Sequence, residues 1–459
     1  MINKENYNKA ILISILTLAW PTVLEQFLQT IVQYIDTAMV GQLGAKATAA
    51  VGISTTVNWL INSPLSAAGV GLTAYIAKSI GAKQYENAKK ASVQSIFLTL
   101  SLGIFIGILT LGISPFLPNW LGAEASIQKE ASTYFAIICL PMLFRASIIL
   151  FGAVLRAAGD TKTPMRVNVT MNLINIILNY IFIYDTKTIK ISSATFTIWG
   201  AGLGTTGAGL GTAISYVIGG LYMIIVWYRT PVISPAHQSI RINRHILHAC
   251  VKVGFPVALE RTFSCLGHVV FTSLVANLGT IAFAAHTIAL TAEEAFYIPG
   301  YGMQAAAATL SGNAVGAGDN LKLKHITRTL LWLIVAIMAA SGGLLFFNAS
   351  FIMSIFTKDS DVIHLGTTVL KMVAISEPVF GIAVILEGIF NGVGDTLVPF
   401  FISLSCMWGI RILMTYLFIH FGNANLPTIW CCMIANNVCQ GCIMFFRYKR
   451  GNWNPIGKK

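Results

Sequence analysis

One acidic residue stands inside a long apolar stretch near the start of the chain. Asp36 lies in "IVQYIDTAMVGQLG" (residues 31–44), with hydrophobic residues on both sides. An ionised aspartate at the centre of a bilayer costs about 2.5–3.5 kcal/mol on translocon scales. A carboxylate of that cost needs partners or a bound ion. We therefore take Asp36 as the first candidate functional residue and expect it to hold a cation or a proton.

Polar residues at helical spacing occur in a later apolar stretch. Asn172, Asn175 and Asn179 follow one another at intervals of three and four residues, which places them on one helical face. At about 1.5 Å per residue, Asp36, Asn179 and Thr212 reach a similar depth, roughly 7–12 Å below the outer surface. Together they would form an oxygen-rich site for Na⁺ or share a proton. The alternative is that the asparagines only link helices, each contributing about 0.6 kcal/mol.

The composition indicates a protein that lies mostly in lipid. Of 459 residues, 55% are hydrophobic and 10% charged, whereas soluble domains carry about 25% charged residues. The net charge of +13 is explained by basic cytoplasmic loops rather than by nucleic-acid binding. The first apolar run is too long for a cleavable signal, so we expect it to remain as a membrane helix. The eight cysteines lie in or beside apolar segments and predict no disulfide framework.

Twelve apolar stretches are long enough to cross a bilayer, so we predict an all-α polytopic membrane protein. The predicted helices cover residues 10–41, 51–78, 92–118, 131–155, 164–184, 204–228, 246–278, 283–310, 326–350, 361–391, 397–421 and 427–447. An even number of spans puts both termini on one side. With the termini inside, about 21 Lys and Arg face the cytoplasm and about five face outward. This imbalance predicts cytoplasmic termini.

The two halves of the chain repeat. Residues 20–83 align with residues 255–318 without a gap, with 15 identities in 64 positions. We therefore expect two six-helix lobes, residues 1–228 and 246–459, joined by a cytoplasmic linker at 229–245. Parallel repeats related by a pseudo-twofold axis along the membrane normal are a transporter architecture. Asp36 falls on Phe271 in this alignment, so its role belongs to the first half alone.

Several motifs give the sequence a family resemblance. The "D-T-x-x-V-G-x-L-G" pattern beginning at Asp36, the "GDTKTP" and "GDTLVP" turns and the "G-x-G-T-A-I-S" run at 209–215 resemble the multidrug and toxic compound extrusion (MATE) transporters. The resemblance covers nearly the whole chain. It implies a cation or proton site at Asp36, Asn175, Asn179 and Thr212. Relatives of this kind carry a second aspartate where Asn179 stands.

The resemblance also points to one branch of that family, the branch named for the DNA-damage-inducible F protein. This assignment rests on Pro21, 15 residues before Asp36, and on the assumption that no acidic residue occupies the middle of the tenth helix. Proline removes a backbone hydrogen bond, so Pro21 is the predicted kink of the first helix. Glu293 and Glu294, found only in the second half, and Asn172 are candidates for the substrate cavity, where the acids would attract cations.

The sequence as a whole predicts a secondary active exporter and not an enzyme. Entry of Na⁺ or H⁺ would drive amphipathic, mainly cationic compounds out of the cytoplasm, with no organic cofactor. A lipid or lipid-linked oligosaccharide flippase is the alternative, and a membrane-embedded transferase is a third reading that lacks the clustered carboxylates it needs. We expect a monomer in a prokaryotic inner or plasma membrane, without nucleic-acid partners and without a bound metal other than Na⁺.

Overall fold

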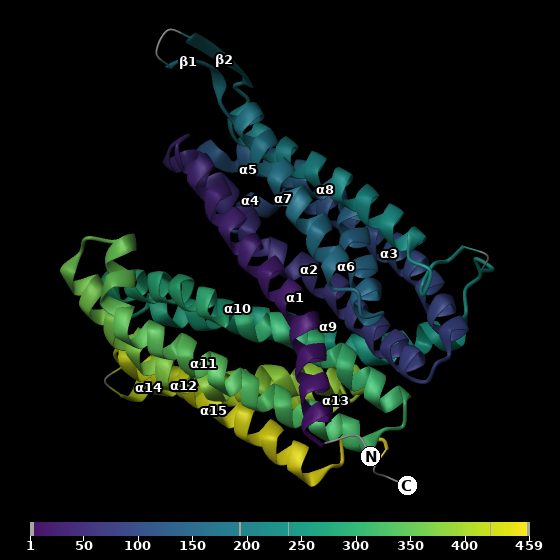
Figure 1. Cartoon of the computed structure of the whole chain (residues 1–459). Helices are drawn as coiled ribbons and strands as arrows, with labels where there is room; N and C mark the ends of the chain where they lie inside the picture. Colours follow the sequence, from purple (N-terminus) through teal and green to yellow (C-terminus); the bar gives the residue numbers. More distant parts are fainter. Residues whose placement is uncertain (1–3, 192–193, 237, 423, 457–459) are drawn as a thin grey trace. The chain divides into compact units, whose positions relative to one another are not determined.

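The computed structural model describes residues 4–191, 194–236, 238–422 and 424–456, and most of them are helical (Figure 1). The predicted all-α membrane fold is confirmed. The helices are α1 (Lys4–Gly41), α2 (Ala45–Gly81), α3 (Tyr85–Ile113), α4 (Leu117–Trp120), α5 (Ala125–Cys139), α6 (Met142–Ala157), α7 (Lys162–Ile183), α8 (Gly204–Arg229), α9 (Arg244–Ala276), α10 (Thr280–Gly316), α11 (Asn320–Phe356), α12 (Ser360–Val393), α13 (Leu397–Ser405), the π-helix η1 (Cys406–Ile412), α14 (Leu413–Phe421) and α15 (Leu426–Arg450).

The helices of the described part account for twelve membrane crossings. Nine helical segments are long and apolar enough to span a bilayer, and α5 with α6 forms a tenth, bent span. Helices α9 and α10 have 33 and 37 residues, or about 50 Å at 1.5 Å per residue. They are therefore also long enough to cross. Polar side chains, among them Glu260, Glu293 and Glu294, lower the hydropathy of these two helices.

The fourth predicted span is not the single straight helix expected at residues 131–155. It is divided into α5 and α6, whose axes differ by 48°. The break falls at Leu140 and Pro141. Proline has no backbone N–H and its ring displaces the preceding turn, so it interrupts a helix at this position. Pro141 was the sequence signal for the bend.

The eleventh predicted span, residues 397–421, contains a second irregularity. Its central residues Cys406–Ile412 form the π-helix η1 between α13 and α14. Arg411 lies on this wider turn and is 6% exposed. Its guanidinium donates to the Asn437 side-chain oxygen at 3.1 Å and lies 5.4 Å from the centre of the Phe271 ring. The π-turn therefore places a basic side chain inside the helix packing.

A β-hairpin joins α7 to α8, where the sequence analysis expected only an outer loop (Figure 1). Strand β1 (Asp185–Ile191) pairs antiparallel with β2 (Ala194–Ala201), and Thr188 faces Thr197. The two segments read "DTKTIKI" and "ATFTIWGA", and both are rich in the β-branched residues Thr and Ile. Such residues favour a strand.

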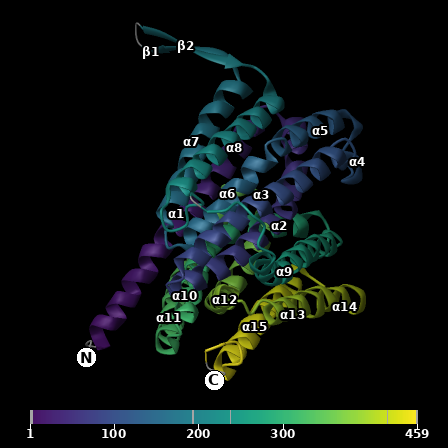
Figure 2. The same ribbon diagram turned by 90° about the vertical axis from the view of Figure 1, so that its right-hand side faces the viewer.

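The described chain forms two compact units. Unit 1 contains Met1–Gln26, Thr73–Tyr85 and His248–Lys459, and unit 2 contains Phe27–Leu72 and Glu86–Leu247. In the first half, the boundaries between the units fall within α1, within α2 and at the start of α3. In unit 2, α7 and α8 run side by side in both views (Figures 1 and 2). This pair carries most of the predicted site.

Candidate functional site

Asp36 lies on the part of α1 that belongs to unit 2, beside α7 and α8. A buried apolar cluster lies one helical turn from the site on each helix. It contains Met39 and Val40 of α1, Ile183 of α7 and Ala208 of α8. The Tyr184 hydroxyl adds a hydrogen bond of 3.0 Å to the Met39 carbonyl oxygen. These contacts fix the three helices together on one side of Asp36. They explain why residues far apart in the sequence meet at one level.

Hydrogen bonds connect the four predicted site residues. The Asn179 side-chain nitrogen donates to Asp36 Oδ1 at 2.9 Å and lies 3.3 Å from Asn175 Oδ1. Asn175 in turn lies 3.2 Å from the Thr212 hydroxyl. Asn175 and Asn179 are buried, whereas Asp36 is only partly buried. The structure thus brings together Asp36, Asn175, Asn179 and Thr212 within unit 2.

The Asn175 amide bridges Asp36 and Thr212. Its nitrogen donates to both Asp36 carboxylate oxygens at 3.1 Å, and its oxygen accepts from the Thr212 hydroxyl at 3.2 Å. This orientation satisfies a negative carboxylate, because it presents a donor to it.

Close packing of α8 against α7 depends on glycine. A Cβ atom at Gly211 would lie 2.1 Å from Asn179 Oδ1, and one at Gly207 would lie 2.3 Å from the Phe182 carbonyl oxygen. The spacing of four residues puts both glycines on the face of α8 that meets α7. Small residues at this spacing allow membrane helices to approach closely. Gly211 of the 209–215 motif and Gly207 just before it therefore let α8 approach α7 closely enough to fix the position of Asn179.

Among the described residues, no basic side chain forms an ion pair with Asp36. Among the described residues of unit 2, Arg145 is the one buried basic residue. It donates to Asn58 Oδ1 at 3.0 Å and lies 5.2 Å from the centre of the Tyr216 ring. Tyr134 lies within electrostatic range of both Asp36 and Arg145. The charge on Asp36 is thus compensated by amide donors and not by a fixed cation.

Two further predicted residues of the first half lie outside this hydrogen-bonded group. Asn172 is on the same helix as Asn175, and its buried side-chain nitrogen has no partner among the described residues. Pro21 lies inside α1, in the segment assigned to unit 1. The next residue, Thr22, donates its hydroxyl to the Gly302 carbonyl oxygen at 2.6 Å. This bond anchors α1 directly beside the proline.

Glu293 and Glu294 lie on α10 in unit 1 and have different surroundings. Glu293 is 1% exposed and accepts a hydrogen bond from the Tyr297 hydroxyl. Glu294, the next residue, is exposed. Only Glu293 is therefore enclosed by protein. The structure records no contact that joins the two into one site.

Sequence reasoning missed Glu377, which lies in the middle of α12. Its side chain is 1% exposed, neither carboxylate oxygen has a hydrogen-bond partner among the described residues, and its charge interacts with that of Glu293. The assumption that the tenth span has no central acidic residue was therefore wrong. It no longer supports the branch assignment. A glutamate directly before Pro378 inside an apolar run was the signal that should have revealed it.

Fold and site together define a class of protein. The described residues form a helical membrane protein of twelve crossings, and unit 2 contains an oxygen-rich carboxylate site. The MatE family model matches the chain twice, at residues 21–181 and 256–417. Together the two matches cover more than half of the chain, and they begin 235 residues apart, the offset of the internal repeat. The protein belongs to the MatE family.

Relatives and solved structures agree with that membership. The "Probable multidrug resistance protein NorM" of Thermotoga maritima is 26% identical over 96% of this chain and 92% of its own length. The "Uncharacterized transporter YisQ" of Bacillus subtilis is 25% identical over 97% and 95%. A solved structure described as "MATE in the bent conformation" matches with a TM-score of 0.87 at 22% identity, covering 97% of this chain and 96% of that chain. This last likeness shows the fold.

Proposed function

We propose that this protein is a secondary active exporter, in which a cation or proton bound at Asp36 drives amphipathic, mainly cationic compounds out of the cytoplasm. The observation that carries the proposal is the hydrogen-bonded group of Asp36, Asn175, Asn179 and Thr212. The names of relatives, such as "Multidrug export protein MepA" of Staphylococcus saprophyticus, support the same activity.

The site has the donor set for one small cation. The Asp36 carboxylate, the Asn175 and Asn179 amides and the Thr212 hydroxyl lie together, and the Asn179 oxygen is buried without a partner in the described structure. Carboxylate, amide and hydroxyl oxygens are hard ligands suited to Na⁺. A proton shared between Asp36 and these amides would satisfy the same geometry. One carboxylate gives the empty site a charge of about −1, which one Na⁺ or one H⁺ cancels.

The Asn175 amide would compete with an incoming ion for Asp36. Its nitrogen donates to both Asp36 oxygens at 3.1 Å and helps to hold the negative charge of the empty site. An ion that binds the carboxylate would displace this donor, so loading and release would involve the Asn175 side chain. Bending of α1 at Pro21 would then connect the state of Asp36 to the path of the substrate.

The charges buried in unit 1 favour a cationic substrate over an anionic lipid. In its described residues, four glutamates and one arginine are buried: Glu25, Glu260, Glu293, Glu377 and Arg411. A flippase for anionic lipids would need an excess of buried basic side chains. The balance of unit 1 is acidic, which supports export of cations and disfavours the flippase reading.

Orientation and cellular place belong to the same proposal. We place the protein in a prokaryotic cell membrane, acting as a monomer, with both termini in the cytoplasm and the lobes at residues 1–228 and 246–459. Cysteines at Lys129 and Lys187 should react with an impermeant thiol reagent in intact cells, whereas those at Lys83 and Lys322 should not. The reverse pattern would overturn the orientation.

Transport into proteoliposomes, with Na⁺ and H⁺ gradients imposed separately, tests the function. A fluorescent organic cation should be moved by one or both gradients with the wild-type protein. The Asp36→Asn protein should fold and insert but lose the gradient-driven component, because an amide cannot exchange a charge. Full gradient-driven efflux by Asp36→Asn would place the coupling site elsewhere.

A further inference from the structure

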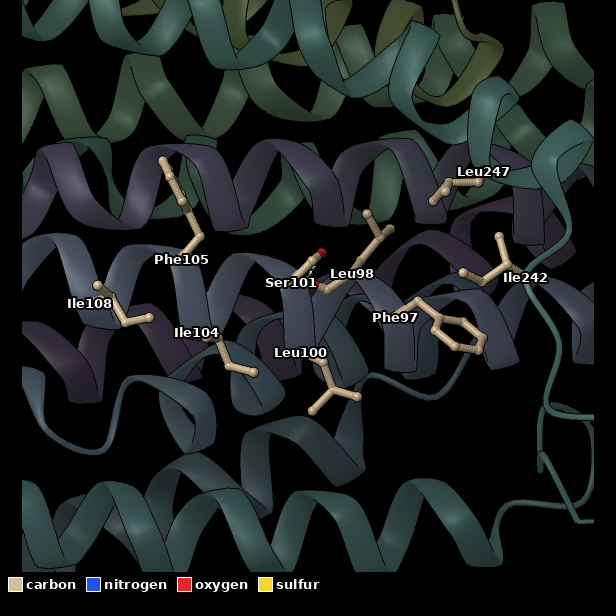
Figure 3. Close-up of a pocket in the computed structure, with 9 residues that line it drawn as sticks. All are labelled: Phe97, Leu98, Leu100, Ser101, Ile104, Phe105, Ile108, Ile242 and Leu247. Carbon is tan, nitrogen blue, oxygen red and sulfur yellow. Dashed lines mark hydrogen bonds between the residues drawn. The ribbon is translucent and has the colours of Figure 1, made fainter.

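Helix α3 carries an apolar groove on the surface of unit 2 (Figure 3). Its volume is about 620 Å³. Phe97, Ile104, Phe105 and Ile108 of α3 line most of its length, and Ser101 is the one polar residue among its lining residues in the described structure. Several of these side chains are exposed, Ile108 to 69%. A groove with such walls is built for a hydrocarbon chain.

The far end of the groove is closed by the polypeptide that follows α8. Ile242 and Leu247 line this end, and Figure 3 shows Ile242 beside Phe97. Gln94 holds the segment on α3: its side-chain nitrogen donates to the Arg241 carbonyl oxygen at 3.0 Å, and its oxygen accepts from the Asn243 N–H at 2.9 Å. Gln94 is 2% exposed. The closure is therefore a fixed part of unit 2.

The basic side chains beside Ile242 remain available to a ligand. Arg241 and Arg244 are exposed, and neither forms an ion pair with any described residue. Lys89, on the same end of α3, differs, because Glu86 pairs with it at 3.3 Å. Two unpaired arginines thus lie on the segment that closes the groove, Arg241 directly before Ile242 and Arg244 two residues after it. Arginine is the side chain best suited to bidentate contacts with phosphate.

The length of the groove matches one leaflet of a bilayer. Phe97 and Ile108 are 11 residues apart, or about 16 Å at 1.5 Å per residue. Half of a hydrocarbon core of about 30 Å is about 15 Å. Gln94, which fixes the basic segment, lies one helical turn beyond Phe97 and so at the level of the headgroups. Length, apolar walls and charge are those of a single phospholipid molecule with an anionic headgroup.

We infer that this groove binds one anionic phospholipid, with an acyl chain along α3 and the phosphate between Arg241 and Arg244. The bound lipid ties the basic segment between α8 and α9 to the membrane surface. It is a site distinct from Asp36 and does not depend on the coupling ion. Zwitterionic phospholipids with the same chains lack the net charge that the two arginines select.

Native mass spectrometry of the full-length protein, after delipidation in detergent, tests this inference. Dioleoyl phosphatidylglycerol is titrated against dioleoyl phosphatidylcholine, which has the same acyl chains. One phosphatidylglycerol should bind more tightly than the rest. In an Arg241→Gln/Arg244→Gln protein its affinity should fall on the order of 20-fold, since each basic residue contributes about 1 kcal/mol near a membrane surface.

Matched variants separate this site from general attraction. Lys322→Gln/Lys324→Gln removes the same charge elsewhere and should leave the tight site unchanged. Ile104→Trp, which fills the groove, should abolish it, whereas Leu109→Trp, an exposed α3 position outside the groove, should not. Thermal melting confirms that each protein is folded. Equal binding of both lipids, or equal losses in the paired variants, would overturn the inference.

Discussion

Asp36 in unit 2 and Glu377 in unit 1 are both acidic residues deep within apolar helices, yet their surroundings differ. Asp36 is partly exposed and accepts a hydrogen bond of 2.9 Å from Asn179. Glu377 is 1% exposed, and neither of its oxygens has a partner among the described residues. A charge sealed from water and from partners is expensive. Glu377 is therefore poorly suited to repeated exchange of an ion.

The comparison shows that neighbours, rather than the presence of a carboxylate, distinguish a site for ion exchange. Around Asp36, the Asn175 and Asn179 amides offer both donors and acceptors within hydrogen-bond reach. Around Glu377, the groups that interact with its charge are another acid, Glu293, and Tyr297, whose hydroxyl donates to Glu293. Amides can satisfy a carboxylate in its empty and loaded states. Two adjacent acids cannot both be charged without a cation.

After Asp36→Asn, the largest effect is expected from Gly211→Ala, which disturbs the packing that positions Asn179. The added Cβ would lie 2.1 Å from Asn179 Oδ1. Overpacking of this kind costs about 1–3 kcal/mol of stability. Displacing Asn179 should also remove its bond to Asp36, so gradient-driven efflux should fall at least tenfold. Thermal melting and proteoliposome transport measure the two effects.

Gly112→Ala is the matched control for that variant. Gly112 lies in α3 of the same unit, and a Cβ there would meet nothing within 4 Å. Alanine in a helix is favoured over glycine by roughly 0.5–1 kcal/mol. The control should therefore be as stable as the wild type or slightly more so, with normal transport. Similar behaviour of the two variants would mean that close packing of α7 and α8 does not position the site.

A smaller effect is expected from Asn179→Asp, which adds a second carboxylate beside Asp36. Two like charges at hydrogen-bond distance repel by several kcal/mol at an effective dielectric of about 20. The midpoint of the ion or pH dependence of export should shift by at least tenfold, while export itself persists. Efflux measured across a series of pH and Na⁺ values checks this. An unchanged profile would show that position 179 does not sense the coupling ion.

The smallest effect is expected from Glu377→Gln. The substitution keeps the shape of a side chain that has no recorded hydrogen bond, so the free energy of unfolding should change by about 1 kcal/mol or less. The ion dependence of export should stay as in the wild type. Loss of ion dependence in this variant, with stability intact, would show that Glu377 also takes part in ion coupling. The coupling site would then have to be assigned to unit 1.

Much of the Asp36 site could be predicted because helix geometry is regular. A rise of 1.5 Å per residue places Asp36, Asn179 and Thr212 at one depth, and spacing of four residues puts Asn175 and Asn179 on one face. The structure brings these four residues together. Their role in ion coupling remains a prediction, since hydrogen bonds alone do not identify an ion.

Other structural features could not be predicted from hydropathy, because they arise where a helix is interrupted locally. The bend at Pro141 and the π-turn that carries Arg411 leave the hydropathy of their spans unchanged. The hairpin between α7 and α8 is favoured by two short runs rich in Thr and Ile that follow α7. Glu377 was missed because one acid near the middle of 34 mostly apolar helical residues hardly changes their mean hydropathy, even with Asp361 and Glu387 in the same helix.

Counting the ions bound at equilibrium by the purified protein tests the central claim most directly. Na⁺ binding by titration calorimetry, and proton uptake after a pH jump, would be measured per molecule for the wild type, Asp36→Asn and Glu377→Gln. We predict that Asp36→Asn binds one Na⁺ or one proton fewer than the wild type, and that Glu377→Gln retains that Asp36-dependent binding. An Asp36→Asn protein that binds as many ions as the wild type would contradict the assignment of the coupling site to Asp36.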